Sequence, residues 1–278
     1  MAMITGSWVR WMRIVSMVLL GLVAGLSLVS CATDPAGTGQ EGARPHVVTE
    51  SDEPEARKRA RIRLELAVGY FEQGQTTVAL DELKQSLSAD PNFGEAYNLR
   101  GLIYMRLNDF RLADESFRRA IALNASDANS LHNYGWLMCQ QGRHAESMPL
   151  FAKALANPQY TDRPKTLMIQ GLCQIKAGQR ALAEESLTRS YELDAGNPIT
   201  GYNLALLLFE REELVRAQFY IRRINNSELA NAESLWLGIK VEHRLGNRDA
   251  EEQLASQLRK RYPQARETAL LDRGAFNE

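Results

Sequence analysis

Small residues recur along this chain at an interval close to 34 residues, and no other feature limits its fold as strongly. The first set of small residues is Ala67, Gly101, Gly135, Gly171, Ala205 and Gly238. The second set is Ala79, Ala113, Ser147, Ala183, Ala217 and Ala250. A third set, of large apolar residues, is Leu83, Phe117, Phe151, Leu187, Ile221 and Leu254. Each set has the successive intervals 34, 34, 36, 34 and 33, so the chain contains a six-fold repeat.

Each repeat has the pattern of two short amphipathic helices. Tyr97, Gly101 and Tyr104 follow one another at helical spacing, and Gly101 and Ala113 are small enough to let two facing helices approach closely. Residues that tolerate the left-handed conformation fall between the helices of the first four pairs: Gly74, Asn108, Gly142 and Gly178. The fifth pair has Glu212 there. One pair cannot bury its own apolar face, so the pairs must stack on one another.

The 34-residue period with this pattern of small and aromatic residues resembles the tetratricopeptide repeat. The resemblance implies an all-α fold, a right-handed solenoid of about six repeats within residues 55–264. We expect the repeats at 60–93, 94–127, 128–163, 164–197, 198–230 and 231–263, followed by a C-terminal tail at 265–278.

The N-terminus predicts a lipoprotein signal peptide at residues 1–30. Arg10 and Arg13 precede an apolar run that ends in Leu-Val-Ser-Cys at residues 28–31. This ending resembles the bacterial lipobox and implies lipidation of Cys31, whereas the alternative is an uncleaved membrane anchor. Ala32 follows the cysteine, and by the sorting rule of such lipoproteins it implies the outer membrane, on the periplasmic side. Residues 31–54, rich in glycine, proline and polar residues, predict a flexible tether.

Composition and motifs argue against several functions. The formal net charge of −1 does not favour nucleic-acid binding, which needs a basic face. The four histidines are scattered, no histidine or cysteine pair has metal-ligand spacing, and no phosphate-binding loop is present. We therefore expect no enzyme activity, no metal and no cofactor apart from the lipid on Cys31. Cys139 and Cys173 are expected to be buried free thiols, although an oxidising compartment would also permit a disulfide.

In tetratricopeptide arrays the first helices line a concave groove, into which places 2, 5, 9, 12 and 13 of each repeat point. Here places 5, 9 and 12 of the first three repeats are largely apolar. The candidate partner-binding residues are Leu64, Val68, Phe71, Leu102, Met105, His132 and Trp136. The Lys, Asn and Arg pattern with which some co-chaperones grip a carboxylate is largely absent. The sequence therefore predicts an apolar groove whose contacts depend little on salt, although part of the stripe could be ordinary core.

Several segments go beyond the generic repeat and resemble one family, the type IV pilus biogenesis lipoproteins PilF and PilW, which act as secretin pilotins. The segments are HNYGWL at 132–137, Tyr160 with Arg163, LFERE at 208–212, LWLGI at 235–239 and LRKRYP at 258–263. The resemblance implies a non-enzymatic outer-membrane lipoprotein that binds secretin subunits and promotes their localisation and multimerisation, with other pilus-assembly proteins as further candidate partners. The alternatives are an adaptor for peptidoglycan-modifying enzymes and a scaffold for outer-membrane protein assembly.

Overall fold

The structure is a computed structural model that describes residues 52–277. The segment predicted to carry the signal peptide and Cys31 lies outside the described residues, as does most of the predicted tether. The described part forms the helices α1 (Glu55–Glu72), α2 (Thr76–Ala89), α3 (Gly94–Arg106), α4 (Phe110–Leu123), α5 (Ala128–Gln140), α6 (His144–Ala156), α7 (Arg163–Lys176), α8 (Arg180–Leu193), α9 (Pro198–Glu210), α10 (Leu214–Asn225), α11 (Ala232–Leu245), α12 (Arg248–Arg261) and α13 (Arg266–Asp272). None of these helices is both long and apolar enough to cross a membrane.

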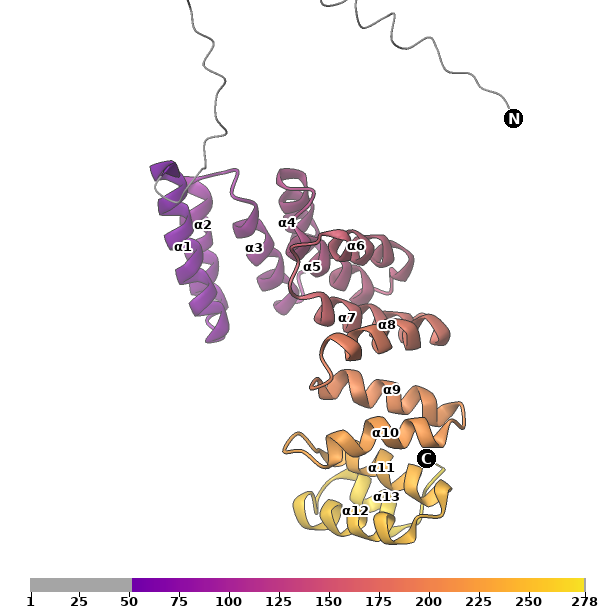
Figure 1. Cartoon of the computed structure of the whole chain (residues 1–278). Helices are drawn as coiled ribbons and strands as arrows, with labels where there is room; N and C mark the ends of the chain where they lie inside the picture. The colour runs from indigo at the N-terminus through magenta and orange to yellow at the C-terminus, as the bar shows by residue number, and fades with distance from the viewer. Residues whose placement is uncertain (1–51, 278) are drawn as a thin grey trace, which may run out of the picture. The chain divides into compact units, whose positions relative to one another are not determined.

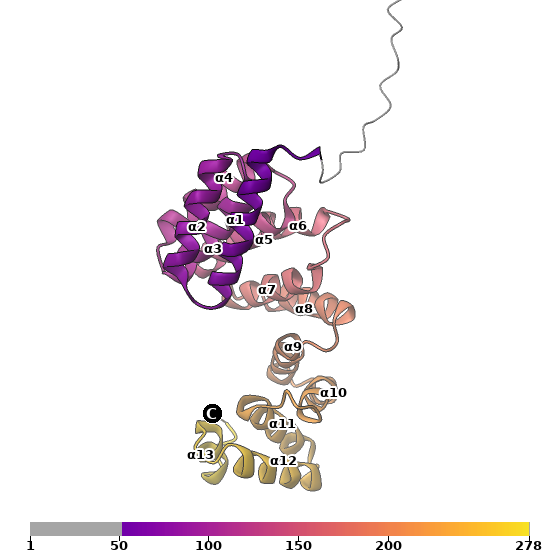
Figure 2. The ribbon, with the colours of Figure 1, turned by 90° about the vertical axis from the view of Figure 1, so that its left-hand side faces the viewer.

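The helices form antiparallel pairs that stack in chain order (Figures 1 and 2). Helices α1 and α2 make the first pair, and α11 and α12 make the sixth. The second helix of each pair packs against the first helix of the next, and successive first helices also touch, as α3 touches α5 and α5 touches α7. The prediction of an all-α solenoid of helix pairs is confirmed.

Each of the second, third and fourth pairs is built around one close contact between a glycine and a large apolar side chain. A Cβ atom added at Gly101 would lie 2.6 Å from the ring of Phe117, and one at Gly135 would lie 2.7 Å from the ring of Phe151. In the fourth pair the same contact joins Gly171 to Leu187. The small residue is therefore required at this crossing, because any side chain would overlap the residue that fills the pair.

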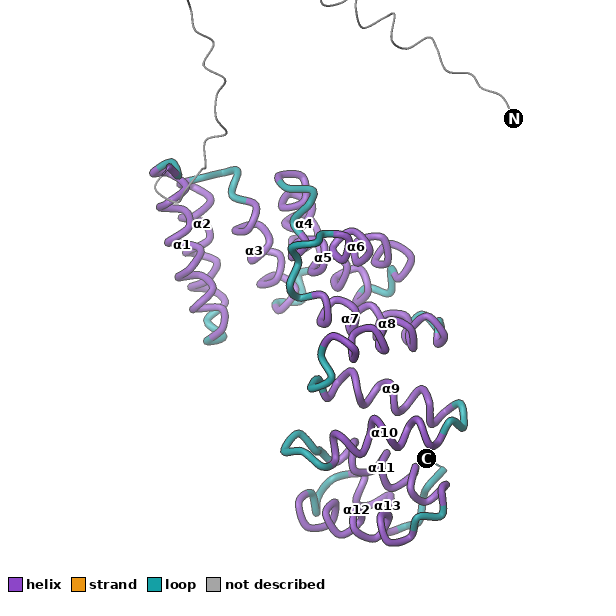
Figure 3. Tube along the Cα trace, in the orientation of Figure 1, coloured by secondary structure: helices purple, strands orange, loops and turns teal. Residues whose placement is uncertain are grey.

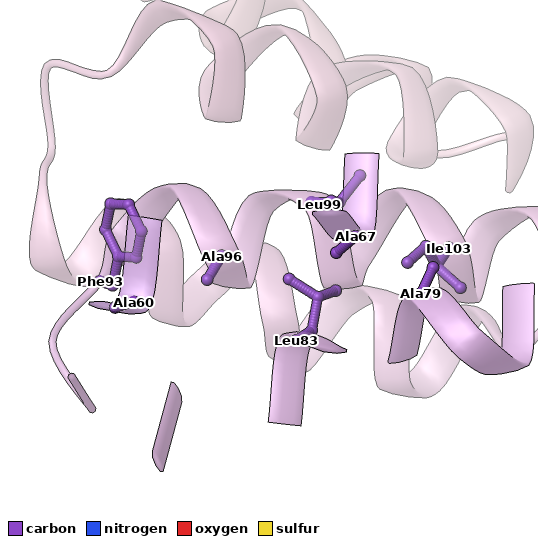
Figure 4. Packing of buried hydrophobic residues seen from close by; sticks show 8 residues of the cluster. All are labelled: Ala60, Ala67, Ala79, Leu83, Phe93, Ala96, Leu99 and Ile103. Atoms are coloured by element: carbon purple, nitrogen blue, oxygen red, sulfur yellow. The ribbon is translucent and has the colours of Figure 1, made fainter. Parts of the chain in front are cut away.

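The first pair shows how the core continues from one pair to the next (Figure 4). Ala67 of α1 and Leu83 of α2 are fully buried and pack in one cluster with Leu99 and Ile103 of α3. The apolar face that α1 and α2 leave open is covered by the following helix. This sharing of the core between neighbours is what makes an isolated pair insufficient.

Short turns join the two helices of every pair (Figure 3). The turn residue has a positive φ at all six turns: Gly74, Asn108, Gly142, Gly178, Glu212 and Gly246. Glu212 adopts a φ of 61°, a conformation that normally favours glycine or asparagine. The repeat geometry thus imposes the left-handed conformation even where the sequence supplies a glutamate.

Two features differ from the sequence analysis. The expectation of free thiols is wrong, because Cys139 of α5 and Cys173 of α7 form a disulfide with their Cα atoms 5.8 Å apart. Their separation of 34 residues does not match the 36-residue interval at this repeat, and comparing equal places therefore did not reveal the pair. A disulfide that closes a loop of this length stabilises by roughly 3 to 4 kcal/mol in the chain-entropy model.

The second difference lies after the sixth pair, where the sequence analysis assigned only a tail. Helix α13 packs there against α11 and α12, and Phe276 stacks on Trp236 and His243 with ring centroids 5.6 and 4.0 Å apart. These residues cover the apolar face that the last pair would otherwise expose. Terminal elements of stacked-repeat proteins commonly have this capping role.

We predict that Gly135→Ala lowers the free energy of unfolding by roughly 1 to 3 kcal/mol, because the new methyl group overlaps the Phe151 ring. The matched control is Gly69→Ala, since a Cβ atom there meets no other atom within 4 Å. The control should be neutral or should stabilise by up to about 1 kcal/mol, because alanine favours a helix. Urea unfolding followed by circular dichroism measures both changes. Equal stabilities for the two variants would contradict the crossing contact as the organising feature.

Candidate partner-binding groove

A cavity of about 480 Å³ opens on the face formed by the first helices of pairs one to four. It is lined by Phe71, Leu102, Met105, Arg106, His132, Asn133, Trp136, Gln140, Lys165 and Ile169. These residues come from the end of α1 and from α3, α5 and α7. The cavity therefore crosses several repeats, and no single pair could form it.

Five of the seven sequence-predicted groove residues line this cavity: Phe71, Leu102, Met105, His132 and Trp136. They come together because the first helices lie next to one another and carry these residues at places 5, 9 or 12 of their repeats. The side chains of Leu102 and Trp136 are partly buried against the core that contains Phe117. Both are anchored by this packing and leave apolar surface open to the cavity.

The other two predicted residues lie elsewhere. Leu64 packs against the buried cluster of the first pair, so it belongs partly to the core. Val68 is 38% exposed and does not line the cavity. The groove thus begins at Phe71, at the end of α1, and not at the start of that helix.

The sequence analysis did not select five of the lining residues: Arg106, Asn133, Gln140, Lys165 and Ile169. Arg106 and Gln140 stand at place 13 of their repeats, and Lys165 stands at place 2. Both places point into the groove of a tetratricopeptide array, so reading all five places would have found these three residues. Asn133 and Ile169 stand at place 6, for which the repeat pattern gave no signal.

A buried hydrogen-bond chain fixes one wall of the cavity. Nδ1 of His132 lies 2.8 Å from Oγ1 of Thr166, which is 2.8 Å from the hydroxyl oxygen of Tyr160. Burial of the imidazole lowers the pKa of His132 to about 4, with a smaller contribution in the same direction from Lys165 and an opposing one from Asp162. His132 is therefore neutral at pH 7 and can serve as an uncharged hydrogen-bonding partner of Thr166.

A second polar contact joins α3 to α5 beside the cavity. The amide nitrogen of the Asn133 side chain donates a hydrogen bond of 3.0 Å to the amide oxygen of Asn98. Near the C-terminal end of α5, the disulfide between Cys139 and Cys173 holds α5 to α7. The helices that form the cavity are therefore cross-linked to one another by polar and covalent contacts as well as by apolar packing.

One group of three potential metal ligands occurs among residues 52–277, namely Cys139, His144 and Cys173. Nδ1 of His144 lies 3.3 Å from Sγ of Cys173. The two sulfur atoms are bonded to each other, and a disulfide sulfur is not the thiolate that binds metals. The two cysteines therefore form a covalent link next to the groove, with His144 beside it.

Known proteins resemble this chain in both sequence and structure. The tetratricopeptide-repeat family model matches residues 64–110 and 100–162. PilF of Pseudomonas aeruginosa, a type IV pilus assembly protein, is 28% identical over 200 residues, which are 72% of this chain and 79% of PilF. The solved structure of that PilF has a TM-score of 0.73 at 26% identity and covers 80% of this chain and 100% of its own.

The crystal structure of PilW, a widely conserved type IV pilus biogenesis factor, has a TM-score of 0.69 and is 32% identical. The match covers 76% of this chain and 97% of that one. This chain belongs to the PilF/PilW family. The family resemblance drawn from the sequence is thereby confirmed, and the chain is a tetratricopeptide-repeat protein of type IV pilus biogenesis.

Two of the segments that carried the PilF/PilW resemblance meet at the groove. Residues 132–137 lie on α5 and supply three of the lining residues. Tyr160, from the connection before α7, holds His132 through Thr166, and Nη1 of Arg163 donates to the Leu155 carbonyl oxygen at 2.7 Å. The family-like residues of the third repeat therefore build and fix one wall of the cavity.

We predict that the depressed pKa of His132 makes the protein less stable in mild acid. An unfolded histidine has a pKa near 6.5, so below that pH the unfolded state binds a proton that the folded state rejects until about pH 4. The contribution of neutral His132 to the free energy of unfolding is fully present above pH 6.5 and is lost as the pH falls toward 4. Lowering the pH from 7 to 5 should cost about 2 kcal/mol through this residue.

The measurement is urea unfolding at pH 7 and at pH 5 for the native chain and for His132→Gln, whose side chain can still pair with Thr166. The pH-dependent loss should shrink by about 2 kcal/mol in the variant. The matched control is His243→Gln, at a partly exposed histidine, which should retain the loss. An unchanged pH dependence in His132→Gln would refute the assignment.

Proposed function

We propose that this protein is an outer-membrane lipoprotein that faces the periplasm and binds a subunit of the type IV pilus secretin through the groove. By holding the subunit at the membrane it promotes secretin localisation and multimerisation. Its role is to bind and position a protein partner, with no reaction catalysed. The coarser role in type IV pilus biogenesis rests on membership of the PilF/PilW family.

The observation that carries the proposal is the accessible apolar cavity around Trp136. Phe71, Leu102 and Ile169 surround the same space. A cavity with large apolar side chains in its lining is suited to a partner, because exposing apolar surface to water is unfavourable and covering it is favourable. Burial of a partner's apolar side chains in it supplies the driving force for binding.

Trp136 is the expected anchor of the contact. Large aromatic residues near the centre of an interface commonly contribute about 2 kcal/mol or more. The indole lies in the third repeat, and the lining residues come from the repeats on both sides of it. An apolar segment of the partner can bind across α3, α5 and α7 in the manner of other groove-bound peptides.

The membrane part of the proposal rests on the sequence. The lipobox-like ending at Cys31 implies a lipid anchor, and Ala32 favours the outer membrane. A flexible chain as long as the predicted tether, about 23 residues, has a root-mean-square reach of about 25 to 30 Å. Such a tether holds the repeat array close to the membrane in which a secretin ring assembles.

We predict that Leu102→Ser combined with Trp136→Ser reduces secretin multimers in the outer membrane, because it removes the apolar anchor of the groove. Both side chains are only partly buried, so circular dichroism should show that the array remains folded. The matched control is Val215→Ser with Phe219→Ser, two residues of α10 that are 71% and 62% exposed. The control should leave multimer formation unchanged.

Normal multimers in the folded groove variant would exclude the groove as the secretin-binding site. The proteins that co-purify from detergent-solubilised envelopes distinguish the alternatives. Secretin or pilus components support the proposal. Peptidoglycan-modifying enzymes or outer-membrane protein assembly factors, recovered without secretin, would replace it with one of the alternatives.

We also predict that Cys31→Ala releases the protein from the membrane as a soluble periplasmic form. Each buried methylene of an acyl chain contributes about 0.8 kcal/mol, and several chains together give lasting attachment. Cell fractionation and intact-mass measurement of the mature protein test this, with Cys139→Ala as a control that should remain attached. A mature native protein with an unmodified Cys31 would refute the lipid anchor.

A further inference from the structure

We propose that the segment bound in the groove is acidic as well as apolar: a short stretch of a protein partner in which carboxylate side chains flank one or two large apolar ones. The inference rests on the proposed function, since it names the chemistry of the partner at the same site. It is based on the charged residues around the cavity, which are not among the apolar groove residues predicted from the sequence.

The lining of the cavity is positively charged. Its ten residues include the cations Arg106 and Lys165 and no carboxylate. Both side chains are exposed, and neither forms an ion pair with any residue of the described part of the chain. Exposed cations elsewhere are of both kinds: Arg216 pairs with both Glu184 and Glu213, whereas Lys84 and Arg189 also lack an ion pair within residues 52–277. Arg106 and Lys165 are distinguished by their place in the lining of a cavity that contains no carboxylate.

Contacts with Phe71 hold the Arg106 side chain in place and leave several of its N–H donors without a partner among the described residues. One of its terminal nitrogens, Nη1, donates to the carbonyl oxygen of Phe71 at 3.2 Å, and the guanidinium lies 5.4 Å from the centre of the Phe71 ring. A guanidinium has five N–H donors in a fork that matches a carboxylate. The backbone contact and the ring orient the group at the cavity, and the remaining donors can receive an anion.

Lys165 extends the positive charge to the other side of the cavity. It stands in the first turn of α7, whereas Arg106 ends α3, so α5 with Trp136 lies between the helices that carry them. Packed helices are about 8 to 10 Å apart, which puts α3 and α7 roughly 16 to 20 Å apart. An extended peptide of about six residues crosses from the axis of α3 to the axis of α7.

A segment with an apolar centre and acidic flanks therefore fits the groove. Its apolar side chains contact Leu102 and Trp136, and its carboxylates approach Arg106 and Lys165. Low-dielectric walls around a concave surface strengthen such charge interactions compared with flat, solvated surface. Opposite charge adds selectivity and a faster encounter, while the apolar contact supplies most of the affinity.

An acidic partner also changes how the binding affinity is expected to depend on salt. A purely apolar groove would bind equally well at low and high ionic strength. Two ion pairs near the surface weaken as salt screens them over a Debye length of about 10 Å at 0.1 M. Affinity should therefore fall with salt, and the fall should depend on Arg106 and Lys165.

The test uses synthetic peptides and the purified full-length chain in phosphatidylcholine nanodiscs, which carry no net charge. The probe is a fluorescein-labelled heptapeptide with Leu-Phe-Leu at the centre and two glutamates on each side. One control peptide has glutamine in place of the four glutamates, and a second has Ser-Gly-Ser in place of Leu-Phe-Leu. Fluorescence anisotropy is measured at 50 and 300 mM NaCl.

The native chain should bind the acidic probe roughly five- to tenfold more tightly than the glutamine peptide at 50 mM NaCl, and this preference should shrink at 300 mM. Arg106→Gln with Lys165→Gln should abolish the preference, so that this variant binds the acidic and glutamine peptides with equal affinity. The matched control is Lys84→Gln with Arg189→Gln, which makes the same charge change on α2 and α8 away from the groove. That variant should keep the preference.

Equal binding of the acidic and glutamine peptides, or a preference that survives in the Arg106 and Lys165 variant, would overturn the inference. Occupation of the groove by a second copy of the chain would also overturn it. Sedimentation would then show dimers that the acidic probe does not dissociate. The two proposals fail separately: if the acidic and glutamine peptides bind equally well while the Leu102 and Trp136 variant loses multimers, only the acidic partner is refuted and the proposed function stands.

Discussion

The contact between a small residue on the first helix of a pair and a large apolar residue on the second is the constraint on which the rest of the structure depends. At Gly135 the ring of Phe151 fills the space that a side chain would take. This contact fixes how closely the two helices approach, and its recurrence fixes the rotation of each first helix in the stack. Residues at the same places of successive repeats therefore face one side, where Leu102 and Trp136 meet in one cavity.

Contacts between first helices then stabilise the shape of that cavity. The disulfide of Cys139 and Cys173 and the hydrogen bond between His132 and Thr166 both join α5 to α7. A groove that is held in its binding shape loses less conformational entropy when a partner binds, so more of the contact energy remains as affinity. In this protein, stabilising the fold and preparing the binding site are the work of the same residues.

The repeat, the crossing glycines and most of the groove could be predicted because each depends on a periodic local pattern. The left-handed turn at Glu212 follows from the period although the residue type argues against it. Contacts between non-equivalent places could not be predicted in this way, and the Cys139–Cys173 pair is one of them. Helix α13 has no periodic signal for a related reason, since a capping element occurs once and no repeat marks it.

Charged residues in a largely apolar groove carry information about function that the repeat pattern does not. Exposed ion pairs contribute little to stability, so the pairing of some surface arginines with acids says little about binding. An unpaired cation on a concave, partly apolar surface is different, because its field acts on whatever enters. Arg106 and Lys165 stand at such positions on either side of Trp136, in repeats whose other groove residues are uncharged. In the function proposed here, the apolar residues supply the contact area for a partner, and the two cations restrict which partners bind well.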